Sequence, residues 1–321
     1  MPADVGTQLQ TVSIIIPVKS LEDPCLDRCI RSLRSQDYDG GFEVIAVEGG
    51  TIPQARNEGV RRARGRYIAF INSDCTAPRE WLSTLIGHME DNPGLGGVGG
   101  VSKVAEDTIL GKAVNSLYGT FLGSLRSASL YQTQEPIDVS SLSTSNCVFT
   151  RRLLVELKGF NEKFNMNEDT ELSMRVKAAG LRLRLYPDAP VYHEAPRSLQ
   201  MFSDKFYWWG HSRAKAMLTD WRLIDTRIIL LYLIGVATPL SALLSKLFPL
   251  YILLLYHLAI TANAVKKVFE GTELFPGLLV APLNFVQHAS YFAGLSAGLL
   301  DGRYGKREPA SFKTRNELFN M

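Results

Sequence analysis

The sequence has little cysteine and lacks common secretion signals. It holds 4 cysteines and 5 histidines among 321 residues. No Asn-X-Ser/Thr acceptor site for N-glycosylation occurs, and the first residues, "MPADVGTQLQ", show no basic segment followed by an apolar run. We therefore expect no secretory signal peptide and a reducing compartment.

The four cysteines do not form a recognisable metal motif. Cys25 and Cys29 are four residues apart, which differs from the Cys-X-X-Cys spacing of most zinc sites. Cys75 and Cys147 stand alone in the sequence. The pattern favours free, buried thiols over a zinc site.

The net charge of the chain is small. The 35 basic and 32 acidic residues give a formal net charge of +3, so the total does not indicate a nucleic-acid partner. Hydrophobic residues make up 46% of the chain, which is enough for a sizeable core.

The first two thirds of the chain alternate apolar runs with helical patterns. Between residues 11 and 194, β-branched runs predict buried strands and amphipathic stretches predict helices. The first strands are expected at 11–18, 42–48 and 67–72, and the first helices at 24–36, 52–65 and 77–91. This order predicts an α/β fold with a mostly parallel sheet covered on both faces.

The last third contains three long segments without formal charge. They cover residues 228–244, 247–265 and 274–300 and are 17, 19 and 27 residues long. Since a bilayer crossing needs about 17–25 residues, we expect two to three transmembrane spans. If the first part of the chain and the basic tail at 301–321 both lie in the cytoplasm, the number of crossings is even, whereas three segments give an odd number, so the number stays open.

A mixed aromatic and basic segment precedes these apolar stretches. Residues 199–227 combine tryptophan, tyrosine and phenylalanine with lysine and arginine. This composition suits the headgroup layer of a membrane, so we expect an amphipathic interfacial segment after a catalytic domain at 1–198.

Several acids stand where parallel strands or helices should end or begin. Glu48 and Asp74 follow expected strands, Glu168 and Asp169 open an expected helix, and His193 comes later. Each acid alone could be a helix cap, and a lone histidine is often structural. Taken together, Asp74 with His193 could hold a divalent cation, and Asp169 could accept a proton from a hydroxyl.

Five motifs in order carry a family resemblance. They are "VSIIIPV", "EVIAVEGG", "QARNEGVRRARGRYIAFINSDC", "GFNEKFNMNEDTELSMRVKAAG" and "VYHE". Their order and spacing over residues 11–215 resemble glycosyltransferase family 2, with the GT-A fold. Appended apolar segments are similar to those of the cellulose-synthase-like and polyprenol-linked-glycan mannosyltransferase branches.

The resemblance implies a role for individual residues. The implied donor-binding set is Pro17, Val18, Glu48, Arg56, Asn57, Asn72, Ser73 and Arg213. Asn72 to Asp74 match the family's DxD metal motif, Asp74 and His193 match residues at the metal, and Asp169 matches the general base of inverting members. Glu168, Trp209 and His211 have possible supporting roles, the last two near a Gln-X-X-Arg-Trp motif of processive relatives.

The sequence also departs from that pattern. The paired acids after the second strand are Glu48 and Gly49 here, and the first acid of DxD is Asn72, which brings no charge. Gln-X-X-Arg-Trp is not present as such, which argues against a long-chain processive synthase.

The resulting prediction is a membrane-bound inverting glycosyltransferase that uses Mn²⁺ or Mg²⁺. It would move a hexose, with GDP-mannose favoured over UDP-glucose, to a hydroxyl of a polyprenyl- or dolichyl-linked glycan. We expect a multi-pass protein of the plasma membrane, with its catalytic domain cytoplasmic, in N-glycan or surface-polysaccharide synthesis. One alternative uses the lipid phosphate as acceptor; another, motivated by Asn72, is a non-catalytic nucleotide-sugar-binding scaffold.

Overall fold

The chain folds into two compact units. The computed structural model describes residues 12–120, 122–124, 130, 133–226, 228–229, 232, 247–305 and 310–319. Unit 1 comprises the described residues of 12–103, 133–193 and 310–319, and unit 2 those of 104–130 and 194–305. Each unit is therefore discontinuous in sequence, whereas the predicted domains were consecutive.

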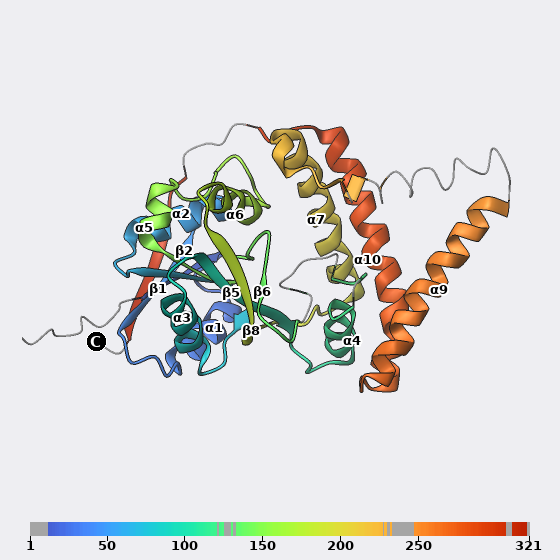
Figure 1. The fold of residues 1–321 in the computed structure, drawn as a ribbon, viewed down its shortest axis with the longest axis horizontal. Helices are drawn as coiled ribbons and strands as arrows, with labels where there is room; N and C mark the ends of the chain where they lie inside the picture. Colours follow the sequence, from blue (N-terminus) through green and yellow to red (C-terminus); the bar gives the residue numbers. More distant parts are fainter. Residues whose placement is uncertain are drawn as a thin grey trace, which may run out of the picture. The chain divides into compact units, whose positions relative to one another are not determined.

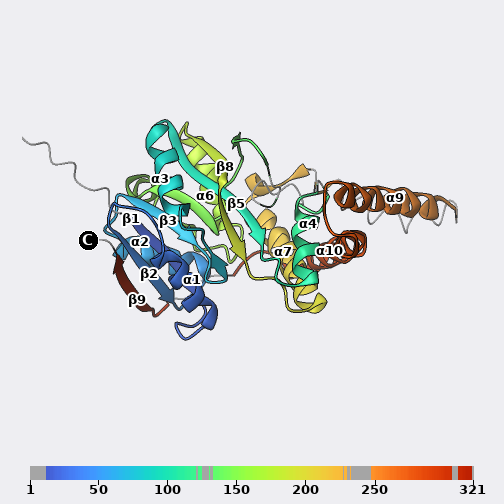
Figure 2. The same cartoon turned by 90° about the horizontal axis from the view of Figure 1, so that it is seen from below.

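Unit 1 is built on one sheet, with strands in the order β4-β8-β5-β7-β3-β1-β2-β9 and β6 paired with β8 (Figure 2). The strands are β1 Val12–Val18, β2 Phe42–Glu48, β3 Tyr67–Ile71, β4 Cys75–Thr76, β5 Leu95–Val104, β6 Ile137–Asp138, β7 Asn146–Thr150, β8 Arg182–His193 and β9 Lys313–Phe319. Its helices are α1 Pro24–Arg34, α2 Ile52–Arg62, α3 Trp81–Asp91, α5 Arg151–Glu156 and α6 Glu168–Ala178.

The sheet is mixed, so the expectation of a mostly parallel sheet was wrong. Strand β1 pairs in parallel with β2 and with β3. Strand β7 runs antiparallel to β3 and β5, β9 antiparallel to β2, and β4 and β6 antiparallel to β8. An apolar run shows that a strand is buried but not its direction, which depends on where the connection re-enters the sheet.

Alternate side chains of β1 divide between the two faces of the sheet. Val12, Ile14 and Ile16 join the core cluster that α1 and α3 cover. Ile15 points to the other face, where a Cβ on Gly59 of α2 would lie 2.5 Å from its Cγ2. Both faces are thus covered, as a strand that is apolar at all positions but Ser13 predicts.

Helix α3 begins later than expected. The sequence placed its start at residue 77, but Cys75 and Thr76 form strand β4 and the helix begins at Trp81 after the N-cap Glu80. Asp74 consequently lies in a turn before a strand, and the alternative that it caps a helix is wrong.

Unit 2 contains α4 Ile109–Tyr118, α7 Leu199–Thr219, the short 3₁₀ helix η1 Trp221–Leu223, α9 Leu247–Phe269 and α10 Leu274–Asp301. Helices α7 and α10 lie side by side (Figure 1). Their contact depends on glycine, since a Cβ on Gly294 would lie 1.8 Å from the Tyr207 carbonyl oxygen and one on Gly210 2.0 Å from that of Tyr291.

The expected membrane spans receive no support from these helices. Segments 247–265 and 274–300 do form α9 and α10, but none of the helices in the described part of the chain combines the length and apolar character that a bilayer crossing requires. Apart from residues 228, 229 and 232, the segment 228–244 lies outside the described residues.

A strand near the end of the chain is part of the sheet of unit 1. Residues Lys313–Phe319, expected to be part of a basic tail, form β9 along the edge of β2 (Figure 2). Phe319 stacks on Phe42 with ring centroids 5.1 Å apart, so this strand adds to the core of unit 1.

Candidate active site

A tight turn at the end of β3 presents the first group of polar side chains. The buried strand ends at Ile71, and the Cys75 amide donates to the Asn72 carbonyl oxygen at 3.1 Å, which closes a turn through Ser73 and Asp74. Asn, Ser and Asp favour such turns because their side chains bond to nearby backbone. The Asp74 side chain is 51% exposed as a result.

Strand pairing brings His193 to this turn. Strands β4 and β8 run antiparallel with Cys75 opposite His193 and Thr76 opposite Tyr192. The register therefore places two residues that are distant in sequence directly across from one another, and their side chains share one face of the sheet.

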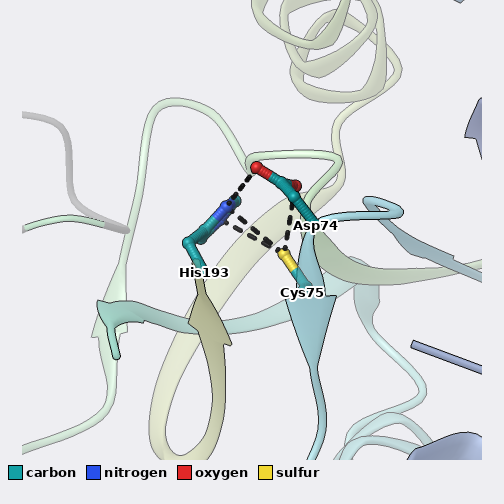
Figure 3. A group of neighbouring side chains, drawn as sticks. All are labelled: Asp74, Cys75 and His193. Atoms are coloured by element: carbon teal, nitrogen blue, oxygen red, sulfur yellow. Dashed lines mark hydrogen bonds and ion pairs between the residues drawn. The ribbon is translucent and has the colours of Figure 1, made fainter. Parts of the chain in front are cut away.

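Asp74, Cys75 and His193 form a compact cluster (Figure 3). The Cys75 Sγ lies 3.3 Å from His193 Nδ1 and 3.8 Å from Asp74 Oδ1, and His193 Nδ1 lies 3.5 Å from Asp74 Oδ2. One ligand atom from each residue lies within 4.8 Å of the other two, so an oxygen, a sulfur and a nitrogen converge. This donor set fits a divalent cation, and it brings the predicted metal residues Asp74 and His193 together.

A buried ion pair involves Glu168, the residue just before the expected general base Asp169. Arg56 on α2 donates to the Glu168 carboxylate at the start of α6, and the two side chains are 4% and 7% exposed. The second terminal nitrogen of Arg56 lies 3.4 Å from the Asn72 side-chain oxygen. Burial raises the pKa of Glu168 to about 7; Arg56 opposes this shift and Asp169 adds to it.

Asp169 follows Glu168 in the first turn of α6. Its Oδ1 accepts a hydrogen bond of 2.7 Å from the Thr170 amide, and the side chain is only partly buried. A carboxylate that keeps a free oxygen at a partly open position can accept a proton, so the geometry agrees with a base at this residue.

The predicted nucleotide-pocket residues also meet. Pro17 and Val18 end β1, and Val18 is the register partner of Glu48 at the end of β2. Glu48 Oε2 accepts from the Leu21 amide at 2.8 Å and Oε1 lies 3.4 Å from Lys313 Nζ. The Leu21 amide is the main cause that lowers the pKa of Glu48, and Lys313 lowers it further.

Asn57 has structural partners for its side chain. Its amide nitrogen donates to the Phe160 carbonyl oxygen at 2.9 Å and to Glu162 at 2.8 Å, and its oxygen accepts from the Phe160 amide. It therefore holds the loop before α6, while its predicted contact with the donor stays a prediction, as does that of the buried Arg56.

The predicted residues of α7 belong to unit 2. Trp209, His211 and Arg213 all lie on this helix. His211 Nε2 lies 2.8 Å from Asp301 Oδ2 at the end of α10, which joins two helices of the same unit. The contact of Arg213 with the donor and the supporting roles of Trp209 and His211 stay predictions.

Two residues of the site were not foreseen. Cys75 was expected to be a free buried thiol; it is buried and forms no disulfide, but it also faces His193. Its place beside Asp74 was the available signal. Lys313 was assigned to a tail, although the apolar positions 312, 318 and 319 hinted at further structure.

Comparison with known proteins gives a consistent picture. Residues 67–266 match the family described as "Glycosyl transferase family group 2". The pre-mycofactocin glycosyltransferase of Mycobacterium tuberculosis is 26% identical over 239 residues, which cover 65% of this chain and 48% of the relative. The poly-β-1,6-N-acetyl-D-glucosamine synthase of Staphylococcus epidermidis is 24% identical over 283 residues, 85% of this chain and 64% of the relative. The chain thus spans about half to two thirds of their lengths.

A solved structure shares the fold. The mannosyltransferase PcManGT from Pyrobaculum calidifontis, in complex with GDP-Man and Mn²⁺, superposes with a TM-score of 0.50 at 17% sequence identity. The match covers 90% of this chain and 86% of the other. The likeness supports the GT-A-like fold of an α/β unit with a mixed sheet.

Proposed function

The chain belongs to glycosyl transferase family group 2, and we propose that it transfers a sugar from a nucleotide diphosphate sugar to an acceptor hydroxyl. The observation that carries this proposal is the position of Arg56. Its guanidinium contacts Glu168, next to Asp169, and approaches Asn72, which opens the turn to Asp74. One buried side chain thus contacts both the residue before the candidate base and the first residue of the turn that carries Asp74.

Asp74 and His193 would hold a divalent cation, Mn²⁺ or Mg²⁺, with Cys75 beside them. The cation would neutralise negative charge that develops on the departing diphosphate. Asn72 contributes no charge here, so the charge of Asp74 carries most of the electrostatic contribution from this turn.

Asp169 would accept the proton of the attacking hydroxyl. A sugar hydroxyl must lose its proton as the new bond forms, whereas a lipid phosphate is already ionised and needs no base. Asp169 beside a buried ion pair therefore favours a hydroxyl acceptor, with inversion at the anomeric carbon as the proposed outcome. Transfer to a polyprenyl phosphate is the second possibility and predicts an Asp169→Asn variant with full activity.

For the donor we propose GDP-mannose first and UDP-glucose second. The solved structure in complex with GDP-Man and Mn²⁺ supports this order, while the relative named as an N-acetyl-D-glucosamine polymer synthase adds UDP-N-acetylglucosamine to the panel worth testing. Pro17, Val18 and Glu48 would line the nucleotide pocket at the ends of β1 and β2.

We also propose a polyprenyl- or dolichyl-linked acceptor and a site of action at the cytoplasmic face of the plasma membrane. Support comes from large apolar side chains that α9 and α10 leave exposed: Leu254, Leu258, Phe269, Leu278 and Leu300 are 55% or more exposed, with Leu300 at 89%. Exposed apolar patches commonly mark surfaces that contact a protein or a membrane, and the partner proposed for this surface is lipid.

The test is transfer of radiolabelled sugar from a donor panel to extracted polyprenyl lipids. Purified full-length protein would be assayed with Mn²⁺, with EDTA, and as the Asp74→Asn and Asp169→Asn variants. Transfer from one donor, lost with EDTA and in both variants, supports the proposal. Donor binding without transfer to any lipid, unchanged by EDTA, would instead indicate the non-catalytic scaffold.

A further inference from the structure

We infer that Cys75 is a third metal ligand and that it makes this cluster a zinc-selective site, at which Zn²⁺ binds more tightly than the Mn²⁺ or Mg²⁺ of the proposed reaction. The inference concerns the same cluster and rests on the proposed function only for its effect on transfer. Mg²⁺ prefers oxygen ligands, while Zn²⁺ also takes thiolate sulfur and imidazole nitrogen as ligands.

The distances within the cluster fit a tetrahedral zinc ion. With bonds of about 2.0–2.3 Å, tetrahedral Zn²⁺ separates its ligand atoms by roughly 3.3–3.6 Å, whereas octahedral Mg²⁺ brings neighbouring oxygens to about 2.9 Å. The three contacts here are 3.3, 3.5 and 3.8 Å. The 3.5 and 3.8 Å contacts involve different oxygens of the exposed Asp74, whose carboxylate can rotate to present one oxygen to both neighbours.

The backbone holds the sulfur and nitrogen ligands in place. Cys75 and His193 are register partners in neighbouring strands, so neither needs a long, flexible side chain to reach the other. Cys75 is 1% exposed and lies within the apolar core cluster of unit 1. Little conformational freedom is lost on binding, and the thiol proton is released to solvent.

This ligand set predicts that zinc inhibits sugar transfer. Three protein ligands on a four-coordinate ion leave one open position, whereas a six-coordinate ion leaves three. A diphosphate that binds through two oxygens therefore finds too few positions on zinc. We expect added Zn²⁺ to lower the transfer rate measured with Mn²⁺, and we expect this inhibition to weaken in a Cys75→Ser variant.

The test uses the metal-free full-length chain and Co²⁺ as a spectroscopic probe for zinc. A thiolate ligand gives bound Co²⁺ a near-ultraviolet charge-transfer band, and tetrahedral geometry gives intense visible absorption. Titration of Zn²⁺ should remove both bands. Zinc and manganese affinities would be measured by calorimetry in the wild type, in Cys75→Ser and in a Cys25→Ser control, whose half-buried thiol lies outside the cluster.

Many protein sites bind Zn²⁺ more tightly than Mn²⁺, so that order in the wild type does not test the role of Cys75. The comparison of the wild type with Cys75→Ser does. Loss of even an outer partner of a ligand costs about 10- to 100-fold in metal affinity, so Cys75→Ser should weaken Zn²⁺ binding at least about tenfold and change Mn²⁺ binding by less than about twofold. Cys25→Ser should change neither. Thermal unfolding in EDTA would show whether each variant is folded. If a variant is not folded, the Co²⁺ spectrum of the wild type tests the inference without it.

Absence of the charge-transfer band in the wild type, or zinc affinity unchanged in Cys75→Ser, overturns the inference. If sugar transfer with Mn²⁺ is still observed, the proposed function survives that result. If the band is present and no donor is bound or turned over, the zinc site stands and the proposed function fails.

Discussion

Arg56 and Glu168 form an ion pair in the interior of unit 1, between α2 and the start of α6. Their side chains are 4% and 7% exposed, and the Arg56 guanidinium also lies 5.7 Å from the centre of the Phe160 ring. A buried charge without its partner is far more costly than the pair. This dependence makes the pair a sensitive probe of the first turn of α6, which carries Asp169.

Arg56→Gln should destabilise the protein more at pH 8 than at pH 5. Burial raises the pKa of Glu168 and the charge of Arg56 lowers it, so without Arg56 this pKa rises further above its ordinary value. The folded state then keeps a proton that the unfolded state releases, so stability falls as pH rises through this range. We expect a loss of about 3–5 kcal/mol at pH 8 and less at pH 5, measured by urea unfolding.

The control for that experiment is Arg61→Gln on the same helix. Arg61 is 59% exposed and pairs with Glu58 at the surface, so its loss should cost less than about 1 kcal/mol at both pH values. An equal cost of Arg56→Gln at the two pH values would show that Glu168 does not titrate in this range.

Asp169→Asn should lower kcat and leave donor affinity unchanged. The amide keeps the shape and the Thr170 contact of the side chain but cannot accept a proton. General base catalysis is worth about 10²–10⁴-fold, so we expect a loss of that size with a sugar hydroxyl acceptor. Steady-state kinetics and donor titration would measure the two quantities, with the exposed Asp188→Asn as the matched control.

Gly100→Ala should destabilise unit 1, because β5 and β8 approach closely there. A Cβ on Gly100 would lie 1.8 Å from the Ala189 carbonyl oxygen, which belongs to the strand that ends in His193. Overpacking of this kind costs about 1–3 kcal/mol or more. A Cβ on Gly94 meets nothing within 4 Å, so Gly94→Ala should change stability by less than about 0.5 kcal/mol. Similar melting curves for both variants would refute the close approach.

Phe319→Ala should destabilise the protein although it lies near the end of the chain. Phe319 stacks on Phe42 and packs against the main core cluster, so its removal should cost about 1–3 kcal/mol. Its neighbour Leu318 is 51% exposed, and Leu318→Ala should have little effect. Chemical unfolding of the two variants would test whether β9 is an integral strand; equal stabilities would argue against it.

The sequence predicted much of the first half of unit 1. Strands β1, β2 and β3 and helices α1 and α2 were foreseen, because apolar runs and helical periods are local patterns. The order of five motifs also indicated the family that the comparisons support. Helix α3 was also foreseen with its end at residue 91, but its start was placed at residue 77 instead of Trp81, and the two-residue strand β4 was missed because it is too short to show a pattern.

The sequence by itself determined which residues are buried along β1 to β3 and which acids stand at their ends, since these depend on the chain's own periodicity. Only the tertiary structure decided that Cys75 faces His193, that Arg56 neutralises Glu168, and that Lys313–Phe319 completes the sheet. Each of these pairings joins residues distant in sequence. They are set by strand register and by the free-energy cost of leaving a buried charge or a sheet edge unpaired. A local sequence pattern reveals neither the register nor this cost.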